Sequence, residues 1–220
     1  MSNEKKAVIF DLDGTLLDTL RDLAESGNAV LQARGFDPHP VDAYRTFIGN
    51  GMTNLVRDIF PEGHRPAAGD ETDAILAEYR EAYGRNWQNT TKPFPGIAEL
   101  LNELRDRGVS FGVMSNKAHD FTVKCVDVFL PGWNWNSVLG AREGVPKKPD
   151  PTAALEVAAA SGVEPSNCFF IGDSDVDMMT AVNAGMYAVG VSWGFRPVEE
   201  LLQHGASSIL DAPEDLLALL

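Results

Sequence analysis

Two aspartates stand two positions apart near the start of the chain, directly after the apolar segment 7–10. Such a segment predicts a buried strand, and ligands bind at the carboxyl edge of a parallel sheet. Asp11 and Asp13 would repel each other if both were ionised, so their spacing implies a cation or a shared proton. Gly14 would let the chain leave the strand sharply. The alternative is a polar turn in which one aspartate caps the backbone.

A second acidic cluster follows the apolar segment 168–171 and leads into a predicted helix. It contains Asp173, Asp175 and Asp177. Carboxylate oxygens on a rigid strand edge suit Mg²⁺, which prefers a few carboxylates together with substrate phosphate and water. Ser174 or Asp175 could also cap the helix, and capping is compatible with metal binding.

Two further segments of the sequence carry polar groups that could bind phosphate, namely a hydroxyl with an amide and an ammonium. Ser115 and Asn116 follow the predicted strand 109–114 and could hold phosphate oxygens, or they could cap a helix. Lys148 precedes Pro149, and a fixed ammonium can neutralise a transferring phosphoryl group, although such a lysine is also typical of a solvated loop. Together the four positions supply a nucleophile, an acid, hydrogen-bond donors, a cation and metal ligands, which phosphoryl transfer requires.

The elements that must position these residues alternate between strand and helix. Apolar segments predict strands at 7–10, 109–114, 137–139, 168–171 and 187–191. Helical patterns lie at 97–104, 152–160 and 175–184, and they are followed by Gly108, Gly162 and Gly185. This alternation predicts an α/β core with a mostly parallel sheet.

Residues 16–92 interrupt the alternation, because they contain helical patterns and no clear strand. The segment is too long for an ordinary strand-to-strand crossover and suits a separate helical insert. We therefore expect an α/β catalytic core of residues 1–15 and 93–220 that carries a helical cap of residues 16–92.

The charge balance of the chain restricts its partners. The 220 residues include 32 acidic and 18 basic side chains, a formal net charge of −14. We therefore expect no nucleic-acid partner, and a metal with a few placed cations would have to attract an anionic substrate locally. No signal peptide or membrane-spanning run is recognisable, and two widely spaced cysteines predict reduced thiols in a cytoplasmic protein.

In combination, the motifs resemble those of the haloacid dehalogenase-like superfamily of hydrolases, over essentially the whole chain. The segment 11–15 is similar to the first motif, Ser115 to the second, Lys148 to the third and 172–177 to the fourth. The resemblance implies a Rossmann-like core with a small helical cap inserted after the first strand. Within the superfamily the chain is most similar to phosphoglycolate phosphatases, through the segments 47–51, 115–117, 148–151, 184–186 and 192–196.

The resemblance also implies a role for each matching residue. Asp11 would attack phosphorus and bind Mg²⁺, whereas Asp13 would protonate the leaving group, activate water and bind the metal through its carbonyl. Lys148 would neutralise Asp11 and the phosphoryl group, and Asp173 would be a metal ligand. Asp177 would orient Lys148 or the metal shell rather than bind the metal directly. The expected substrate-binding residues are Gly14, Thr15, Asn50, Ser115 and Asn116.

The cap is the expected source of substrate selectivity. A loop that contains Asn50 between Gly49 and Gly51 would approach the substrate closely. Arg45, Lys117 or Arg196 could pair with a substrate carboxylate, or each could be an ordinary surface charge.

We therefore expect Mg²⁺-dependent hydrolysis of a small phosphorylated metabolite, a phosphoglycolate-like phosphomonoester, through an aspartyl phosphate. An aspartate at position 13 favours cleavage of a C–O–P linkage, because an alkoxide leaving group needs a proton. One alternative is a phosphotransferase similar to β-phosphoglucomutase, and another is a non-catalytic regulatory protein that kept the fold. We expect no membrane partner, and the sequence leaves monomer and homodimer open.

Overall fold

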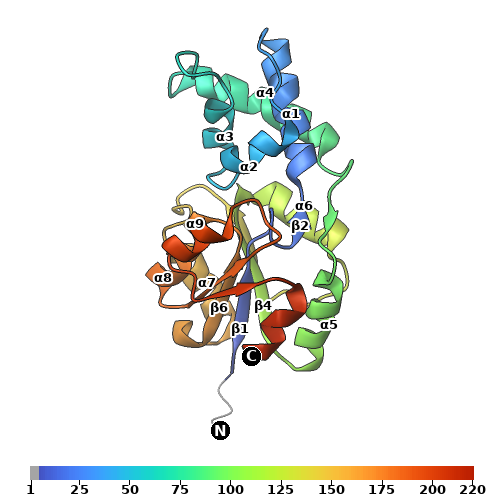
Figure 1. Ribbon diagram of the computed structural model, residues 1–220, viewed down its shortest axis with the longest axis vertical. Helices are drawn as coiled ribbons and strands as arrows, with labels where there is room; N and C mark the ends of the chain where they lie inside the picture. Colours follow the sequence, from blue (N-terminus) through green and yellow to red (C-terminus); the bar gives the residue numbers. More distant parts are fainter. Residues whose placement is uncertain (1–4) are drawn as a thin grey trace. The chain divides into compact units, whose positions relative to one another are not determined.

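The chain forms two compact units in a computed structural model that describes residues 5–220 (Figure 1). One unit comprises the described residues up to Leu17 together with Pro93–Leu220, and the other is Asp18–Lys92. The two crossings between them, β2 (Leu17–Asp18) and β3 (Lys92–Pro93), pair as a two-stranded sheet. None of the helices in residues 5–220 is long and apolar enough to cross a membrane.

The larger unit is built on a sheet whose order is β5-β4-β1-β6-β7-β8, and each neighbouring pair is parallel. The strands are β1 (Ala7–Phe10), β4 (Ser110–Ala118), β5 (Val138–Ala141), β6 (Cys168–Gly172), β7 (Tyr187–Val191) and β8 (Ser208–Leu210). The predicted α/β class with a mostly parallel sheet is confirmed. The sequence pattern missed β8, because three residues carry too little apolar signal.

The central strand brings the polar segments that follow three strands to one edge. All four residues of β1 are buried, as an apolar strand covered on both faces requires. Phe10 pairs with Val113 of β4 and with Ile171 of β6. The Asp11 N–H continues this ladder by donating to the Ile171 carbonyl at 2.9 Å. The residues beyond these positions therefore emerge side by side.

Helices connect the strands of the larger unit. They are α5 (Ile97–Asp106), α6 (His119–Phe129), α7 (Thr152–Ser161), α8 (Asp175–Ala184) and α9 (Val198–Gln203), with 3-10 turns at Pro165–Asn167 and Pro213–Ala218. The predicted helix ends are confirmed at two glycines. Gly162 and Gly185 adopt left-handed backbone, with φ of 64° and 70°, directly after α7 and α8.

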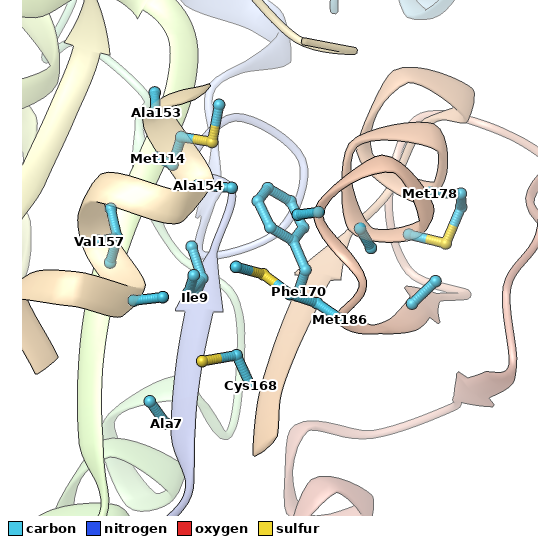
Figure 2. Packing of buried hydrophobic residues seen from close by; sticks show 14 of the residues in the cluster. Ala7, Ile9, Met114, Ala153, Ala154, Val157, Cys168, Phe170, Met178 and Met186 are labelled. Carbon is cyan, nitrogen blue, oxygen red and sulfur yellow. The ribbon is translucent and has the colours of Figure 1, made fainter. Parts of the chain in front are cut away.

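One face of the sheet is covered by α7 and α8 (Figure 2). Ile9 of β1 and Phe170 of β6 point toward this side, where they pack with Val157 of α7 and Met178 of α8. Each of these side chains is fully buried. Burial of a side chain of this size stabilises the fold by roughly 1.5–3 kcal/mol, so the layer fixes the strands that carry the polar edge.

The smaller unit, Asp18–Lys92, is helical. Its helices are α1 (Leu20–Ala33), α2 (Tyr44–Phe47), α3 (Met52–Asp58) and α4 (Asp70–Asn86), with a 3-10 turn at Val41–Ala43. Helix α1 packs along α4. Leu23 and Leu31 of α1 are buried, as are Ile75 and Tyr79 of α4.

A buried aspartate ties the beginning of this unit to its end. Asp22, in the first turn of α1, is fully buried. Its carboxylate accepts hydrogen bonds from the backbone N–H and hydroxyl of Thr90, at 3.0 and 2.6 Å, and from those of Thr91, at 2.9 and 2.8 Å. Because a buried carboxylate needs such partners, this contact fixes where the chain returns toward β3.

Candidate active site

Three buried carboxylates gather at the carboxyl edge of the sheet. Asp11 follows β1, Asp173 follows β6, and Asp177 lies in the first turn of α8. Each offers an oxygen that lies within 4.8 Å of the corresponding oxygens of the other two. Asp11 and Asp173 are two of the residues that the sequence pattern nominated, and the parallel register brings them together across 162 positions of sequence (173 − 11).

A buried lysine lies between two of these carboxylates. The Lys148 ammonium is 2.8 Å from Oδ1 of Asp11 and 2.6 Å from Oδ1 of Asp177, and its side chain is 1% exposed. The Lys148 backbone is held by the side chain of Asn116, which accepts from its N–H at 2.9 Å and donates to its carbonyl at 3.3 Å. Asn116 therefore fixes the lysine segment, a contact that the sequence pattern did not reveal.

Burial shapes the electrostatics of the cluster. Burial raises the pKa of Asp11 to about 6, although the nearby Lys148 ammonium opposes the rise. Burial, together with repulsion from Asp177 and Asp11, raises the pKa of Asp173 well above its ordinary range. For Lys148, burial lowers the pKa, but attraction by Asp11 and Asp177 outweighs it and the net shift is upward. When all four groups are ionised their charges sum to −3 + 1 = −2, which a divalent cation would neutralise.

Asp177 is oriented by the start of α8. Ser174 is the N-cap residue and forms a capping box with Asp177, as the capping interpretation of this segment predicted. Oδ2 of Asp177 accepts from the N–H groups of Asp173 and Ser174 at 3.2 and 3.0 Å, while Oδ1 contacts Lys148. Both oxygens are thus engaged, and the residue is placed to orient Lys148.

Asp173 lies in close contact with two glycines. A Cβ at Gly14 would lie 2.2 Å from Oδ2 of Asp173, and a Cβ at Gly194 would lie 2.2 Å from its Cβ. Oδ2 also accepts a hydrogen bond from the Phe195 N–H at 2.7 Å, and the Thr15 hydroxyl lies 3.5 Å from Oδ1. The loop after β7 therefore positions this carboxylate, which the sequence alone did not indicate.

Asp13 forms a separate ion pair with Lys117. The ammonium lies 2.9 and 3.1 Å from the two carboxylate oxygens, and the two side chains are 1% (Lys117) and 11% (Asp13) exposed.

The strand predicted at 109–114 does not end at Met114, so that prediction is wrong. Strand β4 continues to Ala118 through three buried polar residues, Ser115–Lys117. The helix after β4 has Ala118 as its N-cap residue, so neither Ser115 nor Asn116 caps it.

Three further candidate residues are described by their contacts within their own units. Asn50 and Arg45 belong to the smaller unit, where the Asn50 carbonyl accepts from Asn54 and Arg45 lies 3.5 Å from Asp42. Arg196 belongs to the larger unit, 3.7 Å from Glu200.

Comparison with known proteins shows which family the chain belongs to. The family model of haloacid dehalogenase-like hydrolases matches residues 8–191. Phosphoglycolate phosphatase 1 of Pseudomonas aeruginosa is 31% identical over 96% of this chain and 78% of its own length, and a phosphoglycolate phosphatase of Pseudomonas putida is 34% identical over 98% and 78%. A candidate phosphoglycolate phosphatase from Lactobacillus delbrueckii has a similar structure, with a TM-score of 0.89 and 33% identity over 97% of each chain.

The chain therefore belongs to the haloacid dehalogenase-like hydrolases. It is an enzyme of the phosphoric monoester hydrolase class, similar to phosphoglycolate phosphatases, and the family prediction made from its motifs is confirmed. A candidate β-phosphoglucomutase from Bacteroides vulgatus shares the fold at a TM-score of 0.78, and its 23% identity carries no inference about activity.

Proposed function

We propose that the protein hydrolyses a small phosphomonoester of the phosphoglycolate kind through a phosphorylated Asp11, in a reaction that depends on Mg²⁺. The observation that carries the proposal is the contact of Asp11 with the buried ammonium of Lys148, at 2.8 Å, within a cluster of carboxylates. An aspartate held against a cation at the sheet edge suits a nucleophile for phosphorus.

The donor set fits a magnesium ion. Oxygen ligands are what Mg²⁺ prefers, and the formal charge of the cluster matches a divalent cation. Asp11, Asp173 and the main-chain carbonyl of Asp13 would hold it. Asp177 would orient Lys148 instead, because Asp177 is fully buried, its Oδ1 contacts the Lys148 ammonium and its Oδ2 accepts from two backbone N–H groups and the Ser174 hydroxyl. When bound, the ion would neutralise charge on the phosphoryl oxygens and on Asp11.

The residues of the chain divide the two chemical steps between them. In the first step an Asp11 oxygen forms a bond to phosphorus, the P–O bond of the ester breaks, and Asp13 gives a proton to the departing alkoxide. In the second step Asp13 takes a proton from water, the water oxygen bonds to phosphorus, and the Asp11–phosphorus linkage breaks. Lys148 offsets the charge that collects on the phosphoryl group in both steps. Ser115, Gly14 and Thr15 would hold the oxygens of the phosphoryl group, and the side-chain amide of Asn116 would donate to them as well.

The substrate class is supported by the relatives, which are phosphoglycolate phosphatases aligned over most of the chain. We propose that the unit Asp18–Lys92 serves as a cap that selects the leaving group, with Asn50 as a contact. Replacement of Asn50 by alanine should then change the ranking of phosphate esters, and an unchanged ranking would contradict this part. We also propose a cytoplasmic location, which the reduced thiols of the two buried cysteines, Cys125 and Cys168, suit.

A phosphate-release screen tests the proposal. Phosphoglycolate, sugar phosphates and nucleotides are compared with Mg²⁺ and with a chelator, using the parent protein and Asp11→Asn. We expect Mg²⁺-dependent phosphate release that is strongest on a small carboxylate-bearing ester and lost in the variant. Isomerisation of a sugar phosphate without phosphate release would indicate a phosphotransferase instead.

A further inference from the structure

We propose that Lys117 is a positioning residue that holds the Asp13 carboxylate in place for proton transfer to and from the reacting oxygens. The inference rests on the proposed function, because it assigns Lys117 to the acid–base step of that reaction. It gives the two buried lysines of the site separate tasks. Lys148 serves Asp11, and Lys117 serves Asp13.

The contact between Lys117 and Asp13 involves both carboxylate oxygens. The ammonium lies 2.9 Å from Oδ1 and 3.1 Å from Oδ2, so it restricts rotation of the carboxylate as well as its position. A carboxylate has about four lone-pair positions, and the lysine uses one on each oxygen. The contact with Lys117 therefore fixes Asp13 and does not by itself use up the acceptor capacity of its carboxylate.

Lys117 is itself held rigidly. Its N–H donates to the Ser115 hydroxyl at 3.3 Å, and its carbonyl accepts from the Thr122 hydroxyl at 3.2 Å. Strand β5 approaches so closely that a Cβ at Gly140 would lie 2.7 Å from the Lys117 carbonyl oxygen. An exposed lysine would lose rotamer entropy on forming such a contact, whereas folding has already ordered this one.

Burial also argues against the other task considered for Lys117, recognition of a substrate carboxylate. Its side chain is 1% exposed, and its ammonium contacts Asp13 at hydrogen-bond distance on both oxygens. A substrate carboxylate would have to compete with this contact. Substrate selectivity should therefore survive the loss of Lys117, while the acid–base step should not.

The leaving-group dependence of Lys117→Met tests the assignment. The substrates are phosphoglycolate, glycerol phosphate (an alkyl ester without a carboxylate) and p-nitrophenyl phosphate, whose leaving group needs no proton. We expect kcat/KM for both alkyl esters to fall about 100-fold, the loss typical of a misplaced catalytic group, with little change for the aryl ester. In the Asp13→Asn background the same replacement should cause no further loss. Lys124→Met, at an exposed lysine of α6, is the matched control.

Three results would overturn the assignment. One is an equal loss on alkyl and aryl esters, another is a loss confined to the carboxylate-bearing ester, and the third is a loss that multiplies with that of Asp13→Asn. Retained aryl ester hydrolysis shows that the variant is folded; if Lys117→Met does not fold, Lys117→Gln is assayed in the same way. Failure of the proposed function looks different, because the parent protein would then form no phosphorylated Asp11 at all.

Discussion

Replacement of the proposed nucleophile should stabilise the metal-free protein near neutral pH. Asp11 is a buried carboxylate whose pKa rises to about 6 in the fold, from an ordinary value of 3.8. A carboxyl group with a raised pKa stabilises the fold only in its protonated form. Its contribution is therefore complete below pH 3.8 and is lost as the pH rises through about 6. Asp11→Asn keeps the shape of the side chain and removes this dependence.

The magnitude follows from the two pKa values. Their difference corresponds to about 3 kcal/mol at neutral pH, since one pKa unit equals about 1.4 kcal/mol. The variant also relieves repulsion on Asp173, while Lys148 keeps its contact with Asp177 at 2.6 Å. We therefore expect the free energy of unfolding of Asp11→Asn, relative to the parent, to increase by up to about 3 kcal/mol between pH 4 and pH 7.5.

Urea unfolding in the presence of a chelator measures this difference at both pH values. Addition of Mg²⁺ is the control, because an ion that binds the folded state stabilises the parent and should reduce the advantage of the variant. The reasoning is refuted if the stability difference between the two proteins does not change with pH, or if the variant loses stability relative to the parent as the pH rises.

Two further predictions concern contacts that the sequence pattern did not reveal. Asp22→Ala should lower the free energy of unfolding by about 3 kcal/mol in urea titrations, because the N–H and hydroxyl donors of the buried Thr91 lose their carboxylate acceptor; a loss below about 1 kcal/mol would contradict this role. Gly194→Ala should weaken the apparent Mg²⁺ affinity of the phosphatase reaction by about 10- to 100-fold, because its Cβ would displace Asp173. The control is Gly84→Ala, at an exposed position of α4 where a Cβ meets no atom within 4 Å. This variant should gain roughly 0.5–1 kcal/mol of stability and keep the Mg²⁺ affinity of the parent. Equal Mg²⁺ affinities in Gly194→Ala and Gly84→Ala would count against the steric argument.

The sequence predicted those parts of the site that follow apolar strands. Asp11 and Asp173 were found because a short buried strand precedes each of them, and parallel strands end at one edge. The end of β4 was misplaced because its last residues are polar, and polar residues at a functional sheet edge carry no apolar signal. The ends of α7 and α8 could be predicted because a glycine, which permits left-handed backbone, directly follows each helix in the sequence.

Contacts between distant residues were beyond the reach of these patterns. The ion pair of Lys117 and Asp13 joins residues 104 positions apart, and the hydrogen bonds between Asn116 and Lys148 join residues 32 positions apart. Asp22 lies within an amphipathic helix pattern that predicts which apolar residues are buried but says nothing of a buried carboxylate. Such contacts depend on the relative placement of elements, which only the folded chain defines.

The chemistry of Asp11 is tested most directly by trapping its phosphorylated form. Turnover of phosphoglycolate with Mg²⁺ is quenched in acid during the steady state, and the peptide that contains residues 7–16 is analysed by mass spectrometry. The proposed reaction predicts an added phosphoryl group on Asp11 that hydroxylamine removes and that is absent from Asp11→Asn. Sustained phosphate release by the parent without any modification of this peptide, or equal turnover by the variant, would contradict it.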